Sequence, residues 1–465
     1  MSKQRAQWSG HLGFILAAAG SAIGLGNLWK FPYITFENNG GAFVLVYLAA
    51  IAVVGVPIMV AEVLIGRKGQ RNPVGTFRLL AQGKPGERAW QGVGFLGVMT
   101  GFIILSYYCV IAGWTLRYIL MAVTGQLGTL AHHPEALQSF FGEFLANPYQ
   151  QVLCHTLFMG VTIAVVFFGV GRGIERTARF LMPVLLSILV MLVVYSFWTP
   201  GFREAIGFLF RPNFSELTAG GVLEALGHSF FTLSLGMGTM LTYGSYMRKR
   251  DSIPRAALTI CVLDTLIAIM ACIIMFSIIF SYDFEVTKSS TILFTTVPVV
   301  FFQLPGGAVV SALFYLLVAF AALTSTISLL EVVSSYAIDE LGWGRRRAAL
   351  TTGSAILVFG VLSAVSMGGN ATLSNINLLG RPSTAGAFGT LDYMASNWFL
   401  PVGGLLIALF VGWILTTGET RKELEEGHGP MARLYPAWLF LIRFVAPAAV
   451  AAIIVSVLLG AEYQS

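Results

Sequence analysis

Eleven stretches of about 20 predominantly apolar residues recur along the chain, and no other feature constrains its fold as strongly. A stretch of that length crosses the hydrocarbon core of a bilayer as a helix. The chain is 56% hydrophobic and only 11% charged, whereas about a quarter of a typical soluble chain is charged. The sequence therefore predicts an all-α polytopic membrane protein and excludes a soluble enzyme. The eleven transmembrane helices are expected at residues 11–35, 41–66, 89–122, 152–170, 177–198, 221–246, 256–282, 306–338, 347–367, 392–416 and 435–460.

The positive charges predict the orientation of these helices. The net charge of +6 would suit a nucleic-acid ligand if the cations were clustered, but most of the 28 Lys and Arg residues lie in short loops on one side of the predicted membrane. Cytoplasmic loops carry such an excess. We therefore expect a multi-pass protein of the cell (inner) membrane, with a cytoplasmic N-terminal tail at residues 1–10, an extracytoplasmic C-terminus and no nucleic-acid partner.

Two of the expected helices are interrupted by small residues near their middle. The first contains GSAIGLGN from Gly20 to Asn27, and the sixth contains TLSLGMG from Thr232 to Gly238. Small residues in one membrane helix more often serve close packing. Two interruptions at corresponding places indicate instead a pair of repeats with a substrate site at the bilayer midplane. We expect repeats at 11–198 and 221–416, an outer lid loop near 286–303, and an additional eleventh helix at 435–460.

At these interruptions the sequence resembles the neurotransmitter:sodium symporter family. The resemblance is carried by GFILAAAGSAIGLGNLWKFPYITFENNGGAF in the first helix, by FFTLSLGMG in the sixth, and by ALTSTIS in the eighth. It implies a 5+5 inverted-repeat transporter fold with broken helices 1 and 6. The chain looks most similar to the eleven-helix bacterial members that carry hydrophobic amino acids, because a twelfth helix is absent and Met237 stands where another member has phenylalanine.

The resemblance implies a binding site for a zwitterionic amino acid. Half-helix N-termini attract a carboxylate, and Gly24 stands where monoamine carriers have an aspartate. A mostly apolar pocket with a flexible methionine suits side chains from aliphatic to aromatic. The expected substrate-binding residues are Ala22, Gly24, Leu25, Gly26, Ile104, Tyr108, Phe231, Thr232, Ser234, Met237, Ser325 and Leu329.

The resemblance also implies two sodium ions. Asp264 is the only charge in its membrane span, and a lone intramembrane acid is costly unless it serves an ion or a partner. Another family member has asparagine there, so the carboxylate could strengthen sodium binding or carry a proton. The first ion is expected at Ala22, Asn27, Thr232 and Asp264. The second is expected at Gly20, Ile23, Ala321, Thr324 and Ser325, although hydroxyls such as these often bond the preceding helical turn.

Chloride-dependent relatives bind the anion at positions that correspond to Tyr47, His228, Thr232 and Ala268. Because Ala268 cannot bind an anion and Asp264 already supplies a negative charge, transport is expected to be independent of chloride. His228 supports an alternative, since a protonated histidine could pair with Asp264 or Glu224 and couple protons. A neutral, hydrogen-bonded histidine remains the simpler interpretation.

Two gates follow from the resemblance, and each has a simpler interpretation. Lys30 and Asp392, at the start of helix 10, would form the outer gate, or else be a snorkelling lysine and a helix cap. The inner gate would contain Arg5, Asp339, Trp8 and Tyr246. Glu62 is expected to accept hydrogen bonds from unwound backbone. The spacing of Gly173 and Pro183 would allow the inner end of helix 5 to unwind, or would mark only a kink.

Together these features predict a sodium-coupled symporter that imports hydrophobic amino acids by alternating access, with the lipid bilayer around it and one monomer sufficient for transport. No nucleophile–base arrangement or nucleotide-binding loop indicates an enzyme. One alternative is a proton-coupled or chloride-modulated carrier of another small amino acid or similar solute. A more distant alternative is a sensor that binds an amino acid without transporting it.

Overall fold

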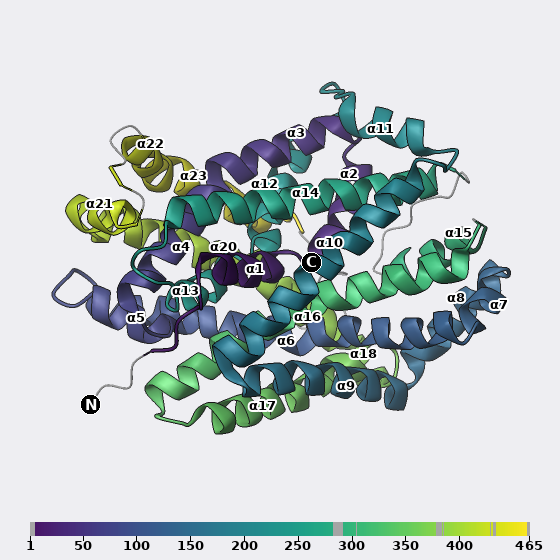
Figure 1. Cartoon of the computed structure of the whole chain (residues 1–465), viewed down its shortest axis with the longest axis horizontal. Helices are drawn as coiled ribbons and strands as arrows, with labels where there is room; N and C mark the ends of the chain where they lie inside the picture. The colour runs from purple at the N-terminus through teal and green to yellow at the C-terminus, as the bar shows by residue number, and fades with distance from the viewer. Residues whose placement is uncertain are drawn as a thin grey trace.

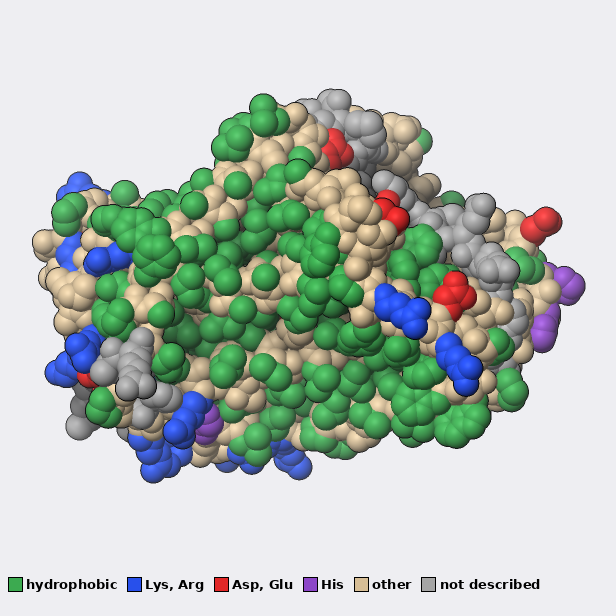
Figure 2. Space-filling view, turned by 90° about the horizontal axis from the view of Figure 1, so that it is seen from above, with side chains coloured by type: hydrophobic (Ala, Val, Ile, Leu, Met, Phe, Trp, Pro, Cys, Tyr) green, Lys and Arg blue, Asp and Glu red, His purple; other side chains and the backbone are tan. Residues whose placement is uncertain are grey.

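The regular elements in the part of the chain that the structure describes are helices, and the longest run side by side (Figure 1). The computed structural model describes residues 5–281, 292–303, 305–377, 384, 386–427, 429–430 and 434–462. Apolar side chains cover the middle of the molecule, and Lys and Arg gather at its left end in Figure 2. A wide apolar belt with charge at its ends is the surface that a bilayer requires.

Within the described residues, nine continuous helices are long and apolar enough to cross a membrane. A bent pair, His11–Ala22 and Gly26–Glu37, makes a tenth span. The expected span at 221–246 is divided into α12 (Ala219–Thr232) and α13 (Thr239–Gly244). The predicted count of eleven is therefore not confirmed by length and composition. The nine helices are Gly41–Gly69 (α3, η2, α4), Glu87–Val123 (α6), Pro148–Phe167 (α9), Val170–Ser196 (η3, α10), Ile253–Ile279 (α14), Gly307–Glu340 (α16), Arg345–Val365 (α17), Gly386–Ile414 (α19, η6, α20, η7) and Leu434–Leu458 (α22, η8, α23).

Short helices connect the spans, and their starts follow ordinary capping chemistry. The Asn72 side chain accepts hydrogen bonds from the first backbone N–H groups of α5, and Thr416 forms a capping box with Glu419 at α21. Part of the expected lid loop lies outside the described residues, and the rest is helical. These connecting helices are α5 (Pro73–Leu80), α7 (Gln126–Ala131), α8 (Pro134–Ala146), α11 (Phe202–Phe210), η4 (Ile292–Thr296), α15 (Val297–Gln303), α18 (Ala371–Asn375) and α21 (Thr417–Glu425).

The broken first helix lies at the centre of the bundle. Its inner half, α1 (His11–Ala22), packs against α10, α14 and α16, and the long helices α6 and α16 pack against each other. Small residues predominate in α1, so its neighbours can approach closely. Gly20, for example, faces Thr324 of α16, where an added Cβ would lie 3.2 Å from the threonine Cβ. This packing brings the break of helix 1 next to the middle of α16.

Candidate functional site

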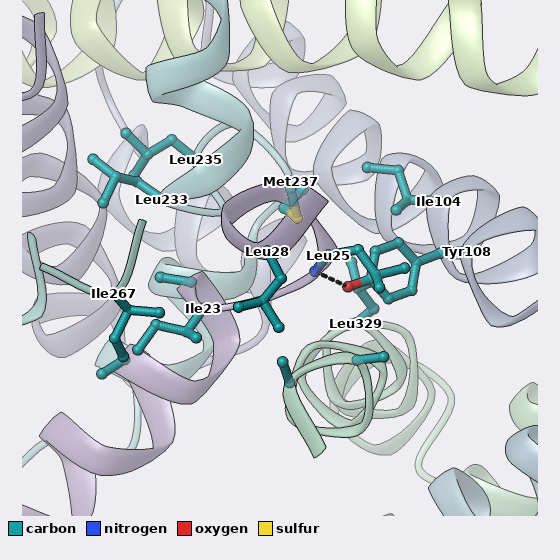
Figure 3. Packing of buried hydrophobic residues seen from close by; sticks show 14 of the residues in the cluster. Ile23, Leu25, Leu28, Ile104, Tyr108, Leu233, Leu235, Met237, Ile267 and Leu329 are labelled. Carbon is teal, nitrogen blue, oxygen red and sulfur yellow. Dashed lines mark hydrogen bonds between the residues drawn. The ribbon is translucent and has the colours of Figure 1, made fainter. Parts of the chain in front are cut away.

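The break in helix 1 leaves backbone groups without helical partners, and side chains satisfy some of them. The chain bends by 51° between α1 and the helix that starts at Gly26, and Ile23 has an extended backbone. The N–H of Gly24 donates to the side-chain oxygen of Asn27 over 3.1 Å. The N–H of Leu25 donates to the Tyr108 hydroxyl over 3.0 Å, the dashed line in Figure 3. The break therefore presents amide donors at a point where a carboxylate could accept from them.

The break in helix 6 depends on glycine for two reasons. Gly236 and Gly238 have φ angles of 80° and 76°, which favour glycine, and Ser234 shares this left-handed conformation at 54°. A Cβ on Gly236 would also lie 2.3 Å from the backbone oxygen of Leu400 in α20. The Gly236 N–H donates to the Glu62 carboxylate over 2.7 Å. Glu62 thus bonds unwound backbone, as the sequence predicts.

The two breaks face a cavity that contains nearly all the expected substrate residues. It is lined by Ser21, Ala22, Gly24, Gly26, Ile104, Tyr108, Phe231, Thr232, Ser234, Met237, Ser325, Ser328 and Leu329. Leu25 lines the adjoining cavity with Lys30 and Phe388. Sequence reasoning missed Ser21 and Ser328. Ser21 adjoins the expected Ala22, and Ser328 lies three residues after Ser325 on the same face of a helix, so their positions offered a signal.

The wall of this cavity is mostly apolar. Figure 3 shows Ile104 and Tyr108 projecting from α6, Leu329 from α16 and Met237 from the break of helix 6, all around Leu25. Each of these side chains is almost fully buried. An apolar wall beside the polar backbone of the helix 1 break is suited to a ligand with one polar and one apolar end.

Asp264 is fully buried in α14, and neutral side chains surround its carboxylate. It accepts hydrogen bonds from the Asn27 amide over 2.8 Å, from the Thr232 hydroxyl over 3.1 Å and from the Tyr47 hydroxyl over 3.4 Å. All three donors are neutral groups, so a charge on Asp264 would be uncompensated by them and the cluster is suited to a cation.

The residues expected at the second ion lie where α1 meets α16. The Thr324 hydroxyl donates to the Ala321 carbonyl over 2.9 Å, and Ser325 donates to the carbonyls of Ser21 and Ala321 over 3.2 and 3.3 Å. Ile23 lies at the end of α1 and is buried. Each hydroxyl donates to a nearby carbonyl, and the lone pairs of its oxygen are left for a cation.

His228 lies beside the first cluster with neither ring nitrogen hydrogen-bonded within the described residues. Its ring stacks on Phe31 at a centroid distance of 5.6 Å and lies 5.8 Å from the Tyr47 ring. The pairings with Asp264 or Glu224 that the sequence suggested are not seen. Ala268 is also buried and offers no polar side-chain atom.

Of the two outer gate residues, Lys30 lines the adjoining cavity. The Lys30 ammonium is 5.2 Å from the centre of the Phe231 ring, and its charge interacts with those of Asp392 and Glu224. The helix that contains Asp392 begins at Gly386, so Asp392 lies inside that helix. The prediction that Asp392 starts helix 10 is therefore wrong.

The inner gate residues form a closed set of contacts. Arg5 pairs with Asp339, and two of its nitrogens donate to the Ser245 hydroxyl over 3.0 and 2.8 Å. Trp8 is fully buried, and its indole N–H donates to the Tyr243 carbonyl over 3.0 Å. The Tyr246 hydroxyl donates to Glu331 over 2.5 Å. These contacts join the segment before α1 to α13 and the residues that follow it, and to α16.

The inner end of helix 5 is helical in this structure. Gly173 lies in the π-helical segment η3 (Val170–Glu175), and Pro183 lies inside α10 (Arg176–Ser196). A Cβ on Gly173 would lie 2.0 Å from the Val165 carbonyl of α9. Gly173 is thus required for packing as well as for any unwinding.

The chain belongs to the sodium:neurotransmitter symporter family, whose model matches residues 5–134 and 149–464. The protein is therefore a multi-pass membrane transporter rather than an enzyme.

Individual relatives agree with this membership. The uncharacterised sodium-dependent transporter YhdH of Bacillus subtilis is 36% identical over 97% of both chains, and an uncharacterised sodium-dependent transporter of Haemophilus influenzae is 31% identical over 98% of both. The crystal structure of MhsT in complex with L-phenylalanine is 42% identical, has a TM-score of 0.88, and covers 97% of this chain and 100% of that one. The fold is therefore that of MhsT.

Proposed function

We propose that this transporter is a symporter that uses sodium to import hydrophobic amino acids, from aliphatic to aromatic, without chloride. The buried Asp264 carboxylate, whose hydrogen-bond partners are neutral, is the observation that carries the proposal. A buried uncompensated charge costs several kcal/mol, which a bound cation offsets. Sodium binding would be coupled to substrate binding, because the helix breaks that adjoin this carboxylate also line the cavity.

The substrate would bind with its polar end at the helix breaks and its side chain against the apolar wall. Its carboxylate would accept from the N–H groups of Leu25 and Gly26 and from Tyr108. The bound L-phenylalanine of MhsT, at 42% identity, supports an amino acid of this class. Gly24 supports it too, since an added Cβ would lie 2.8 Å from both the Ser325 and Tyr108 hydroxyls and leaves no room for an aspartate.

Two sodium ions would accompany each substrate. The first would bind between the Ala22 carbonyl, Asn27, Thr232 and Asp264. The second would bind where Gly20, Ile23, Ala321, Thr324 and Ser325 offer carbonyl and hydroxyl oxygens. Hard cations prefer such oxygen ligands. One sodium ion that crosses a potential of 100 mV contributes about 2.3 kcal/mol to uptake.

Chloride independence follows from the same carboxylate. An anion beside the first sodium ion would meet the negative charge of Asp264, and Ala268 offers it no donor. Repulsion between two buried negative charges at contact distance costs several kcal/mol. The fixed charge would therefore replace the anion.

Alternating access would use the two gates in turn. The inner contacts of Arg5, Asp339, Trp8 and Tyr246 would break while Lys30 and Asp392 close the outer side. Lysine lacks the rigid bidentate fork of arginine, so we expect a weaker outer gate. Unwinding between Gly173 and Pro183 would open a path from the second ion to the cytoplasm.

The protein would lie in the inner membrane with its N-terminus in the cytoplasm and its C-terminus outside. The cations gathered at one end of the molecule support this orientation. One monomer would be sufficient for transport.

Uptake into proteoliposomes tests the proposal. Radiolabelled leucine and phenylalanine would be presented under an inward sodium gradient, under potassium, and under a pH gradient, each with and without chloride. We expect accumulation with sodium alone and no effect of chloride.

Other outcomes would identify the alternatives. Uptake driven by pH would replace sodium coupling with proton coupling through Asp264 and His228, and a need for chloride would refute the role of Asp264 as its substitute. Saturable binding without accumulation would indicate a sensor. No binding of either amino acid would refute the hydrophobic substrate class.

A further inference from the structure

Serine side chains form part of the cavity lining. Ser21 comes from the end of α1, and Ser325 and Ser328 come from one face of α16. Ser328 lies one turn closer to the inner gate than Ser325, beside Leu329. Because the polar end of the substrate is assigned to Leu25, Gly26 and Tyr108, this part of the cavity would receive its side chain.

The hydroxyl hydrogen atoms of these serines are already donated in hydrogen bonds within the protein. The Ser328 hydroxyl donates to the Ser325 carbonyl over 2.8 Å, so Ser21 is the donor in the 2.7 Å bond between the hydroxyls of Ser21 and Ser328. The Ser234 hydroxyl donates to the Ser21 carbonyl over 2.9 Å. A hydroxyl has one hydrogen and two lone pairs.

The lone pairs are what this serine pair can offer a ligand. Both Ser21 and Ser328 are about 1–2% exposed, so bulk water does not satisfy them. An acceptor that faces an apolar group in such a place loses the hydrogen bond it could have made. A ligand side chain with a donor avoids that loss.

We propose that the Ser21–Ser328 pair is a specificity determinant that selects hydrophobic amino acids whose side chain carries one hydrogen-bond donor, such as an indole N–H. This inference rests on the proposed function and names the substrate class more closely. The apolar wall of Ile104, Met237 and Leu329 accepts the bulk of the side chain. The serine pair accepts its single N–H or O–H.

Two isosteric ligands isolate this hydrogen bond. Tryptophan has an indole N–H, and 3-(benzothiophen-3-yl)alanine has a sulfur atom in its place with nearly the same shape. Displacement of radiolabelled leucine from the purified protein in sodium would give the affinity of each. We expect tryptophan to bind roughly three- to tenfold more tightly, as one neutral hydrogen bond provides.

Variants assign the preference to the serine pair. In S328A the Ser21 hydrogen is released and can turn toward the ligand, so the preference should shrink. In the double variant S21A/S328A the ratio of the two affinities should approach one, because neither ligand then meets a hydroxyl acceptor at these two positions. S335A is the matched control, since Ser335 is buried on the same helix, donates to the Val332 carbonyl and lies outside the cavity lining.

The outcomes separate this inference from the proposed function. Sodium-dependent leucine binding with equal affinity for the two isosteres would overturn the inference and leave the symporter standing. A preference that persists in the double variant would also overturn it. No sodium-dependent binding of leucine or tryptophan would overturn both.

Discussion

The side-chain amide of Asn27 donates a 2.8 Å hydrogen bond to the Asp264 carboxylate, and so joins the break in helix 1 to the middle of α14. The two residues are far apart in the sequence. Their contact ties the only acid of α14 to the segment that also lines the cavity. Any ion that binds Asp264 therefore acts directly on the conformation of helix 1.

Asp264→Asn should weaken apparent sodium affinity more than tenfold. The variant keeps the size of the side chain but removes a buried charge, whose contact with a cation is worth about 4 kcal/mol at 4 Å with an effective dielectric constant near 20. The sodium concentration for half-maximal leucine binding measures the effect. Asp251→Asn, a buried substitution away from the cavity, is the control. An unchanged sodium requirement would remove Asp264 from the ion site.

Gly24→Ala should reduce leucine binding at least tenfold. The added Cβ would lie 2.8 Å from the hydroxyls of Ser325 and Tyr108, so both must move out of the cavity wall. Gly92→Ala is a matched control, since an added Cβ there meets nothing within 4 Å. Equilibrium binding of leucine in saturating sodium measures the effect. Equal leucine affinity in both variants would contradict the assigned position of the ligand.

Arg5→Ala should open the inner side of the transporter. The change removes the ion pair with Asp339 and both hydrogen bonds to Ser245. Thr242→Cys provides a reporter, because Thr242 is fully buried in α13 beneath this gate. We expect at least threefold faster maleimide labelling of that cysteine in Arg5→Ala, and partial reversal in the charge-swapped R5D/D339R.

The surface pair of Arg78 and Glu340 controls for charge removal at the same end of the molecule. Arg78→Ala should leave the labelling rate unchanged, because Arg78 contacts Glu340 and Gln91 rather than Asp339. Equal acceleration in both variants would indicate general loosening rather than a gate.

Glu419→Gln should lower the free energy of unfolding by less than about 1 kcal/mol, which is the usual contribution of a surface ion pair. Burial alone would raise the pKa of Glu419, but hydrogen bonds from Lys84 and Thr416 lower it to about 2, from an ordinary 4.5. The stabilisation is therefore complete above about pH 4.5 and is lost as the pH falls toward 2.

Thermal unfolding of the wild type and of Glu419→Gln tests the direction of this pH dependence. The difference between wild type and Glu419→Gln should be constant from pH 8 to pH 5.5 and should narrow only below about 4.5. Glu425→Gln, in the exposed Arg421–Glu425 pair, provides a surface control. A difference that widens as the pH falls would contradict the assignment.

The membrane fold follows from the amino-acid sequence alone, because lipid imposes a length and an apolar composition on every span. Ten of the expected spans correspond to helices or to the bent pair, and only boundaries such as the start of the helix at Gly386 were misplaced. The glycine clusters likewise located both helix breaks. Unwound backbone within a membrane requires residues such as glycine, so a helix break can be recognised from the local sequence.

Which side chains form hydrogen bonds or ion pairs with one another became clear only from the packing of the helices. The sequence singled out Asp264 but could not identify Tyr47 as one of its donors, and it did not distinguish Ser21 and Ser328 from other small residues of their helices. Nor could it decide whether His228 is paired. These properties depend on the rotation and separation of helices that are distant in the chain. A hydrogen bond requires a narrow range of donor–acceptor distances, so small shifts between helices decide whether it forms.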